Sequence, residues 1–303
     1  MTGTTELDPD WFRERARAHR SAHDEDCLGT VSLIDAEARR RGAAAVRTGQ
    51  AISLSRPITA EAAARADDRR PTAQIEVFVE TAGDRTVGTD RVTLDAHGTP
   101  NTHLDGLTHF GIDGEWHGGR PCASPSEEDR SLVAWARHGL VTRAVLADIP
   151  AHRGTEWVEV GAPVTADDIQ ASLDMADVEV VPGDALLLYM GRDRFERAGN
   201  ELLPIARAEH GRPGVGRSAA EWIADNGVSL LCWDFLDAHG PGIEPLVVHH
   251  LIWAIGLALV DCCELGAAAD ALRGRRPPTG LLSVAPLALE QATGCMVNPL
   301  LVT

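Results

Sequence analysis

The chain has 303 residues, of which 44% are hydrophobic and 24% are charged, and this length allows one large domain or two smaller ones. Acidic residues outnumber basic residues by 45 to 28, and the net charge of −17 argues against binding to nucleic acid or to an anionic membrane surface. The sequence has neither the roughly 18 consecutive apolar residues of a membrane helix nor an apolar signal segment, so we expect a cytoplasmic protein.

All 28 basic residues are arginines, and the chain contains no lysine. This excludes a lysine Schiff base with pyridoxal phosphate or with a carbonyl substrate, and it excludes a Walker-type lysine on a nucleotide phosphate. The sequence also lacks the G-x-S-x-G and G-x-G-x-x-G motifs, which removes support for a serine hydrolase of that type and for a Rossmann dehydrogenase. The six cysteines are widely spread, and we expect most of them to be small core residues.

Residues 1–50 predict a polar helical arm that packs on the rest of the chain. One helix is expected to open at Pro9, and a second includes residues 35–41. Farther along, the runs at 51–55 and 74–79 alternate apolar and polar residues, and this alternation predicts half-buried strands.

After a turn predicted at 83–90, strands and helices alternate along the chain. The expected strands lie at 141–149, 185–190, 228–233 and 257–261. One expected helix begins at Thr165, and two others span 218–226 and 246–255. We find no internal repeat and no long linker. The pattern therefore predicts an α/β fold with one continuous domain over residues 1–303.

The densest group of side chains that can bind a metal lies between residues 97 and 117. If residues 101–105 are extended, His103 and Asp105 point to the same face, about 7 Å apart along the strand. His97 has the same parity, and mixed nitrogen and oxygen ligands suit zinc or manganese. The alternative is that these histidines cap turns or form hydrogen bonds in a loop, and one His-x-Asp triplet does not distinguish the two.

This segment resembles the signature of the putative cyclase superfamily, His-x-Gly-Thr-His-x-Asp-x-x-x-His, whose members include bacterial kynurenine formamidase and isatin hydrolase. Thr102, His103, Asp105 and His109 match the pattern. Further segments resemble the longer family members in the same order, at residues 26–30, 47–49, 182–184, 214–222, 285–286 and 293–299. The resemblance implies a β-barrel-like mixed sheet core surrounded by helices, assembled as a homodimer or homotetramer.

The sequence departs from the family pattern at two positions. Thr99 stands where the signature carries its first histidine, and His97 is the nearest substitute. Near the C-terminus, His249 and Asp261 have the spacing of the family's histidine and glutamate, with aspartate in place of glutamate. The shorter aspartate side chain changes the reach of that carboxylate, and with it the number or geometry of bound ions.

The resemblance also implies the roles of individual residues. His103 and Asp105, together with His97 or His249, are expected to hold zinc or manganese, while His109 serves as the general base. Asp261 is expected to support a second ion. Trp116 and Trp233 lie near these segments and are candidate walls for a flat substrate, although most tryptophans are core or interface residues.

The expected reaction is hydrolysis of an amide, lactam or related carbonyl of a small molecule by metal-activated water. The alternative is a cyclase, dehydratase or other lyase of a secondary-metabolite pathway, in which the same metal stabilises an enolate and His109 shifts a proton from carbon. A third alternative is a metal- or ligand-binding protein that has lost activity, for which the departures at Thr99 and Asp261 are the only support.

Overall fold

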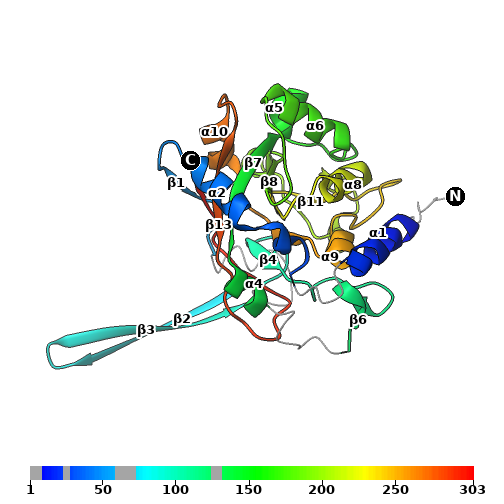
Figure 1. Ribbon diagram of the computed structural model, residues 1–303. Helices are drawn as coiled ribbons and strands as arrows, with labels where there is room; N and C mark the ends of the chain where they lie inside the picture. The colour runs from blue at the N-terminus through cyan, green and yellow to red at the C-terminus, as the bar shows by residue number, and fades with distance from the viewer. Residues whose placement is uncertain (1–8, 23–27, 59–72, 124–131) are drawn as a thin grey trace.

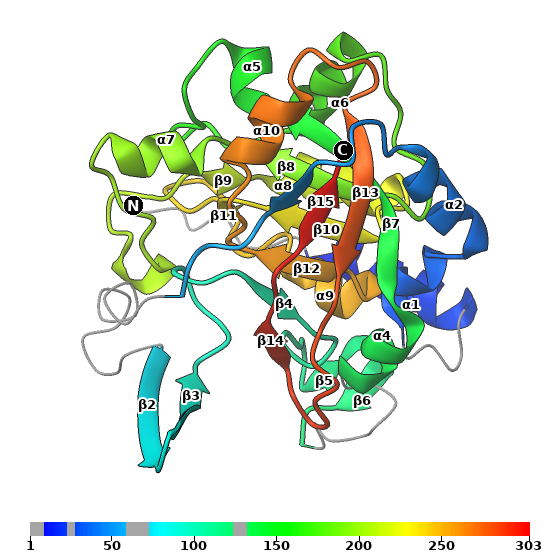
Figure 2. The same cartoon turned by 90° about the vertical axis from the view of Figure 1, so that its left-hand side faces the viewer.

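The computed structural model describes residues 9–22, 28–58, 73–123 and 132–303. A nine-stranded sheet forms the centre of the molecule, and helices cover it (Figure 1, Figure 2). The strands of this sheet are β1 (Ala51–Ser53), β4 (His103–Asp105), β7 (Leu140–Asp148), β8 (Ala185–Tyr189), β10 (Leu230–Trp233), β12 (Ala258–Asp261), β13 (Thr279–Val284), β14 (Gly294–Met296) and β15 (Leu300–Val302).

The order of the strands across the sheet is β1-β15-β13-β7-β8-β10-β12-β4-β14. The four central strands β7, β8, β10 and β12 are parallel, and the strands outside them pair antiparallel. Smaller two-stranded pairs are β2 (Ala73–Ala82) with β3 (Arg85–Leu94), β5 (Glu115–Trp116) with β6 (Arg120–Pro121), and β9 (Gly214–Val215) with β11 (Leu236–Asp237). The predicted α/β fold with a mixed sheet core surrounded by helices is confirmed.

Most connections between the strands carry helices. These helices are α1 (Pro9–Ala22), α2 (Ala36–Ala44), α4 (Leu132–His138), α5 (Ile149–Arg153), α6 (Ala166–Met175), α7 (Arg192–Arg197), α8 (Arg217–Asp225), α9 (His250–Ile255) and α10 (Gly266–Leu272), with short 3₁₀ turns at Gly29–Leu33, His117–Gly119 and Ile205–Arg207. The predicted strands at 141–149, 185–190, 228–233 and 257–261 correspond to the four parallel strands.

Both faces of the central sheet are buried, and each face has its own core. Leu231 and Leu259 pack on one face against side chains of α1, α6, α8 and α9. Their neighbours Leu230 and Ala258 point to the other face, in the core that includes Leu104 of β4 and Leu272 of α10. Successive residues of a strand point to opposite faces, so continuous apolar strands are those covered on both sides.

The described helices near the N-terminus pack on the rest of the molecule. Helix α1 begins at Pro9 and packs on α9, where Phe12 is fully buried and its ring lies 4.9 Å from that of His250. Helix α2 begins after Asp35, whose side chain accepts a hydrogen bond from the backbone N–H of Ala38, and it packs on β7 and β13.

The hairpin of β2 and β3 corrects two predictions. The run at 74–79 does form a strand, but the strand is largely exposed instead of half-buried. The turn predicted at 83–90 is confined to Gly83 and Asp84, because β3 already begins at Arg85. Figure 1 shows the hairpin extending away from the body of the molecule. Alternation in sequence predicts that a strand has two different faces, but it does not determine whether another element covers one of them.

The helix predicted at 246–255 is shorter than expected, since α9 begins only at His250. Leu246 has a positive φ of 56°, a left-handed conformation that interrupts helical geometry, and turns follow up to His249. The predicted end of the helix is confirmed at Gly256, which has φ of 67°. The prediction of a single domain over residues 1–303 stays a prediction.

Candidate metal centre

Strands β4 and β12 bring the first candidate ligands together. His103 lies directly opposite Asp261 in the antiparallel register, and Asp105 lies opposite Leu259. Of residues 101–105, His103–Asp105 are extended in β4, so His103 and Asp105 share one face while Leu104 enters the opposite core. Asp105 is 0% exposed and His103 is 2% exposed. A local alternation and one strand pairing thus place three side chains that could bind a metal on one face.

His249 reaches the same place from the turn before α9. Its Nδ1 atom lies 2.5 Å from Oδ2 of Asp237, and Oδ1 of Asp237 accepts a 2.6 Å hydrogen bond from the backbone N–H of Val248. This carboxylate therefore fixes both the backbone and the ring. The other ring nitrogen, Nε2, lies 3.8 Å from Oδ2 of Asp105 and 3.5 Å from Oδ2 of Asp261.

The four side chains form a closed ring of nitrogen and oxygen atoms. Nε2 of His103 lies 3.5 Å from Oδ1 of Asp105 and 3.9 Å from Oδ2 of Asp261. Together with the two contacts of His249 to the same two aspartates, these contacts close the ring. These separations exceed those of hydrogen bonds. The separations between neighbours in the ring approach the roughly 3.4 Å that separates two ligands bound about 2.1 Å from one tetrahedral ion, whereas the four residues do not all offer ligand atoms within 4.8 Å of one another.

Asp105 gives a second test of whether these residues fit a cation. Its Oδ2 atom is buried and has no hydrogen-bond partner, although Nε2 of His109 and of His249 lie 3.7 and 3.8 Å away. A buried carboxylate oxygen without a partner is costly unless a positive charge offsets it. The residues present therefore fit a divalent metal.

His97 and His109 flank Asp105. Nδ1 of His97 lies 2.8 Å from Oδ1 of Asp105, and its Nε2 lies 2.9 Å from Oγ1 of Thr293, so both ring nitrogens have partners. The His109 ring stacks on the His97 ring, with centroids 3.9 Å apart. Within the described part of the chain, two groups have ligand atoms within 4.8 Å of one another: His97 with His103 and Asp105, and His109 with Asp105 and His249.

The buried charges shift one another's pKa values. Burial raises the pKa of Asp105, but the surrounding His109, His103 and His97 outweigh burial and hold it well below its ordinary value. Burial lowers the pKa of His109 to about 4, against the opposing effect of Asp105. Burial also lowers the pKa of His249, but the Asp237 carboxylate outweighs this and raises it well above its ordinary value. At neutral pH the His109 imidazole is therefore neutral and can accept a proton.

The two tryptophans predicted to contact substrate lie in different surroundings. Trp233 is fully buried, and its indole N–H donates a 2.5 Å hydrogen bond to Oδ1 of Asp261, so it orients that carboxylate. Trp116 is half-buried in β5, a strand of the separate β5–β6 pair. Thr99, at the departure from the family signature, accepts a hydrogen bond at its carbonyl from the buried Arg192.

Two supporting residues were not predicted from the sequence. Asp237 holds His249 from 12 residues away, and Thr293 holds His97 from 196 residues away. No fixed spacing or motif connects these pairs, so only folding brings them together. Among the cysteines, Cys232, Cys262, Cys263 and Cys295 are buried, Cys122 is half-buried, and Cys27 lies outside the described residues.

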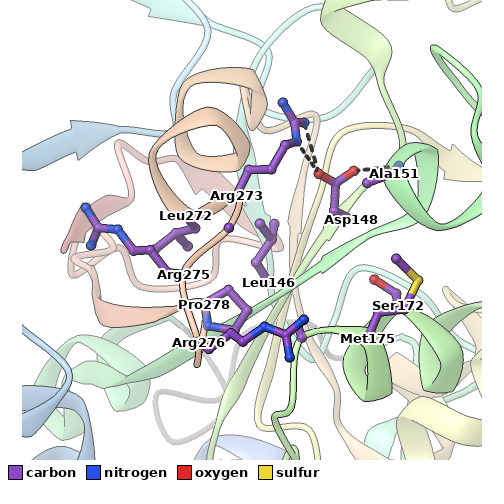
Figure 3. A pocket seen from close by; sticks show the side chains of 12 residues that line it. Leu146, Asp148, Ala151, Ser172, Met175, Leu272, Arg273, Arg275, Arg276 and Pro278 are labelled. Carbon is purple, nitrogen blue, oxygen red and sulfur yellow. Dashed lines mark hydrogen bonds and ion pairs between the residues drawn. The ribbon is translucent and has the colours of Figure 1, made fainter.

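A separate cavity of about 160 Å³ lies at the end of β7, where α5, α6 and the loop after α10 meet (Figure 3). Its wall includes Leu146, Met175 and Arg276, and an ion pair between Arg273 and Asp148, 2.9 Å long, lies at its edge. Leu146 belongs to the core on the face opposite the metal cluster, and none of the candidate ligands lines this cavity.

Comparison with known proteins identifies the family. The family model described as Putative cyclase matches residues 52–239, which is more than half of the chain and includes the His103 to His109 segment. The chain belongs to this family. Among curated proteins, none matches the chain. The resemblance expected from the signature is thereby confirmed.

Solved structures share the fold of this cyclase-family chain. The crystal structure of a novel cyclase has 20% sequence identity and a TM-score of 0.78, covering 94% of this chain and 97% of that chain. An isatin hydrolase bound to the product analogue thioisatinate has 19% identity and a TM-score of 0.60, covering 84% and 92%. Isatin hydrolase A from Labrenzia aggregata, bound to benzyl benzoate, has 18% identity and a TM-score of 0.58, covering 86% and 94%. No helix in the described residues is long and apolar enough to cross a membrane.

Proposed function

We propose that this cyclase-family protein is a metal-dependent hydrolase of an amide, a lactam or a related carbonyl compound. The observation that carries the proposal is the ring formed by His103, Asp105, His249 and Asp261, with one buried oxygen of Asp105 left without a hydrogen bond. A zinc or manganese ion bound there supplies Lewis-acid chemistry, polarising a carbonyl and lowering the pKa of water toward neutrality. The isatin hydrolases among its structural relatives agree with this reaction class.

The four residues of the ring are proposed to hold the metal, with Asp261 also available to a second ion. His97 is proposed to orient Asp105 instead of binding the ion directly, because hydrogen bonds to Asp105 and Thr293 engage both of its ring nitrogens. Such supporting hydrogen bonds fix ligand geometry and tune the affinity of a metal site. Trp233 and Asp237 are proposed to act in the same way on Asp261 and His249.

His109 is proposed to be the general base. Its ring is held parallel to that of His97, and its Nε2 lies 3.7 Å from Asp105 Oδ2, outside hydrogen-bond distance. A neutral imidazole in this position can take a proton from the attacking water and return it to the leaving nitrogen. Trp116 is proposed as a wall for a flat substrate.

The main alternative is a lyase or cyclase reaction at the same residues, in which His109 moves a proton from carbon without attack by water. Turnover in ¹⁸O-labelled water separates the two, with isatin and aryl formamides as the first substrates tested. Hydrolysis places the label in the product acid, whereas elimination or cyclisation leaves that product unlabelled. Conversion of every accepted substrate without incorporation of ¹⁸O would contradict the hydrolase proposal. No turnover by metal-loaded protein would favour the inactive-binder alternative.

We also propose that the chain forms a homodimer or homotetramer through the hairpin of β2 and β3. Ile75, Val77 and Val79 point to one face of the hairpin, and Val92 lies opposite Ile75 on the same face. Val77 is 65% exposed and Val79 is 67% exposed. An isolated two-stranded ribbon is marginally stable in water, so an apolar face of this kind favours contact with a second copy. We place this assembly in the cytoplasm, as the composition suggests.

A further inference from the structure

Arg212 is a buried arginine whose side chain is only partly engaged. The residue is 4% exposed, and its Nε donates a 2.9 Å hydrogen bond to the carbonyl oxygen of Asp237. Among the described residues, no hydrogen bond or ion pair involves its Nη1 or Nη2 atom. A guanidinium carries five N–H donors in a fixed plane, so four donors remain available on the two terminal nitrogens.

The backbone around Arg212 is held rigidly against the segment that supports the metal site. Arg212 exchanges backbone hydrogen bonds of 2.8 and 3.1 Å with His239. Two residues later, Gly214 packs so closely on β11 that a Cβ atom there would lie 1.9 Å from the carbonyl oxygen of Leu236. Only glycine allows this approach, and it fixes the position of Arg212 relative to Asp237.

Two of the charges that act on Arg212 are carboxylates of the candidate metal centre and its support. Burial lowers the pKa of its guanidinium, and the negative charges of Asp237 and Asp261 oppose this effect. Asp237 itself binds His249 through its carboxylate, so Arg212, Asp237 and His249 are joined by consecutive hydrogen bonds. Through Asp237 the guanidinium is thus connected to His249, and it forms no ion pair of its own with a described residue.

A second buried arginine shows what a purely structural role looks like. Arg192 donates through Nε to Glu196, through Nη1 to the carbonyl of Asp234 and through Nη2 to the carbonyl of Thr99. All three of its nitrogens therefore have protein partners. Arg212 has one such partner, and its remaining donors match the geometry of a planar carboxylate, which accepts two parallel N–H bonds.

We propose that Arg212 binds a carboxylate group of the substrate beside the metal, so that the enzyme selects anionic substrates. The inference rests on the proposed hydrolase function, because it assigns the substrate class of the same site. Three carboxyl groups, those of Asp105, Asp237 and Asp261, belong to the candidate ligands or support them. Arg212 supplies the additional positive charge that lets an anion enter.

The test is calorimetric binding of benzoate and benzamide, two flat probes that differ in charge. We expect zinc-loaded wild-type protein to prefer benzoate, and Arg212→Met to weaken benzoate binding by about 10-fold or more while leaving benzamide binding unchanged. Arg212→Lys keeps the charge without the planar fork and should be intermediate. Arg217→Met is the matched control, since Glu221 and Glu244 already bind that half-buried arginine, and it should retain the affinity of the wild type for benzoate.

The same measurement on chelator-treated protein tells whether Arg212 or the metal binds the anion. Stripped wild-type protein should still bind benzoate more tightly than stripped Arg212→Met, provided that circular dichroism shows both to be folded; if Arg212→Met is unfolded, the comparison uses Arg212→Lys. Equal benzoate affinity in the wild type and the variant, or no preference for benzoate over benzamide in the wild type, would overturn the proposal. Because binding is measured without turnover, a negative ¹⁸O experiment would refute the hydrolase function and leave this result interpretable.

Discussion

At the scale of single residues, Asp105 connects the histidines of the candidate metal centre. One of its oxygens lies 2.8 Å from His97 and 3.5 Å from His103, and the other lies 3.7 Å from His109 and 3.8 Å from His249. It is fully buried, so water does not reach either oxygen to replace a lost ligand. The consequences of changing this residue are correspondingly specific.

Asp105→Asn is expected to lower turnover by at least about 100-fold and to weaken metal retention, because a neutral amide is a poorer ligand than a carboxylate. The fold should survive, since the amide has the same shape. Metal content and kcat measured on the same preparation check this. Asp95→Asn, which removes an exposed carboxylate, is the control and should behave as the wild type. A variant that keeps both metal and turnover would show that Asp105 is needed for neither.

His103 and His109 are expected to respond differently to removal. His103→Ala should lose both metal and turnover, because His103 belongs to the proposed ring of ligands. His109→Ala should keep the metal and lose roughly 10² to 10⁴-fold in kcat, the usual contribution of general acid–base catalysis. Metal content from elemental analysis and kcat, both measured on each variant, test this difference. Metal-free His109→Ala protein would instead make His109 a ligand, in agreement with its proximity to Asp105 and His249, and the base would have to be sought at His249 or His250.

At the scale of elements, helix α6 begins with a capping box that depends on Asp168. Its carboxylate accepts hydrogen bonds from the backbone and the hydroxyl of Thr165, and it forms a 2.6 Å ion pair with Arg153. Partial burial raises the pKa of Asp168, but the bonds from Arg153 and Thr165 outweigh it and hold that pKa well below the ordinary value. The ionised form of this carboxyl group is therefore more stable in the folded protein than in the unfolded chain.

Asp168→Asn is expected to destabilise the protein by about 1 kcal/mol at pH 7, the usual cost of losing a helix cap. Stability from a lowered carboxyl pKa is present above the unfolded value of 3.8 and is lost as the pH falls below it toward the folded pKa. The difference between variant and wild type should therefore shrink at pH 3. Urea unfolding at pH 7 and pH 3 measures it. Asp167→Asn, in the same turn but exposed, should cost much less, and equal penalties would refute the role of Asp168.

The hairpin of β2 and β3 is the element through which we expect the chain to oligomerise. Val77→Glu places a charge on the apolar face and should shift the protein toward monomer in light scattering coupled to size-exclusion chromatography. Thr89→Glu places the same charge opposite Phe78 on the other face of the hairpin and should leave the assembly intact. An assembly unaffected by Val77→Glu, or disrupted equally by both variants, would exclude this face as the interface.

At the scale of the whole molecule, the metal is expected to stabilise the fold that assembles its site. The proposed ligands come from β4, β12 and the turn before α9, so the site exists only in the folded chain. At 100-fold excess of metal over its Kd, this linkage is worth about 2.7 kcal/mol. For a chain of this size that corresponds to a Tm roughly 4 °C above that of the metal-free protein.

Calorimetric melting after chelation, and again after addition of zinc or manganese, measures this stabilisation. Elemental analysis of protein prepared without chelator should find at least one divalent ion per chain. Calcium, which prefers oxygen ligands, is the control and should restore little of the lost Tm. Trace metal only, with no rise in Tm on titration, would contradict the metalloenzyme interpretation.

The sequence by itself determined what depends on neighbouring residues. The alternation of strand residues placed His103 and Asp105 on one face, and the alternation of strands and helices along the chain predicted the four strands that form the centre of the sheet. Helix starts at Pro9 and Thr165 followed from local capping chemistry. The resemblance of the segment that ends at His109, together with further segments in family order, predicted the family and its fold.

Only the tertiary structure decided what depends on distant contacts. The support of His249 by Asp237, of His97 by Thr293 and of Asp261 by Trp233 joins residues 12, 196 and 28 positions apart. The exposure of the hairpin and the partly engaged guanidinium of Arg212 could not be predicted from the sequence either. Local sequence specifies the direction in which a side chain points, whereas the partner it meets depends on how strands and turns from separate parts of the chain pack together.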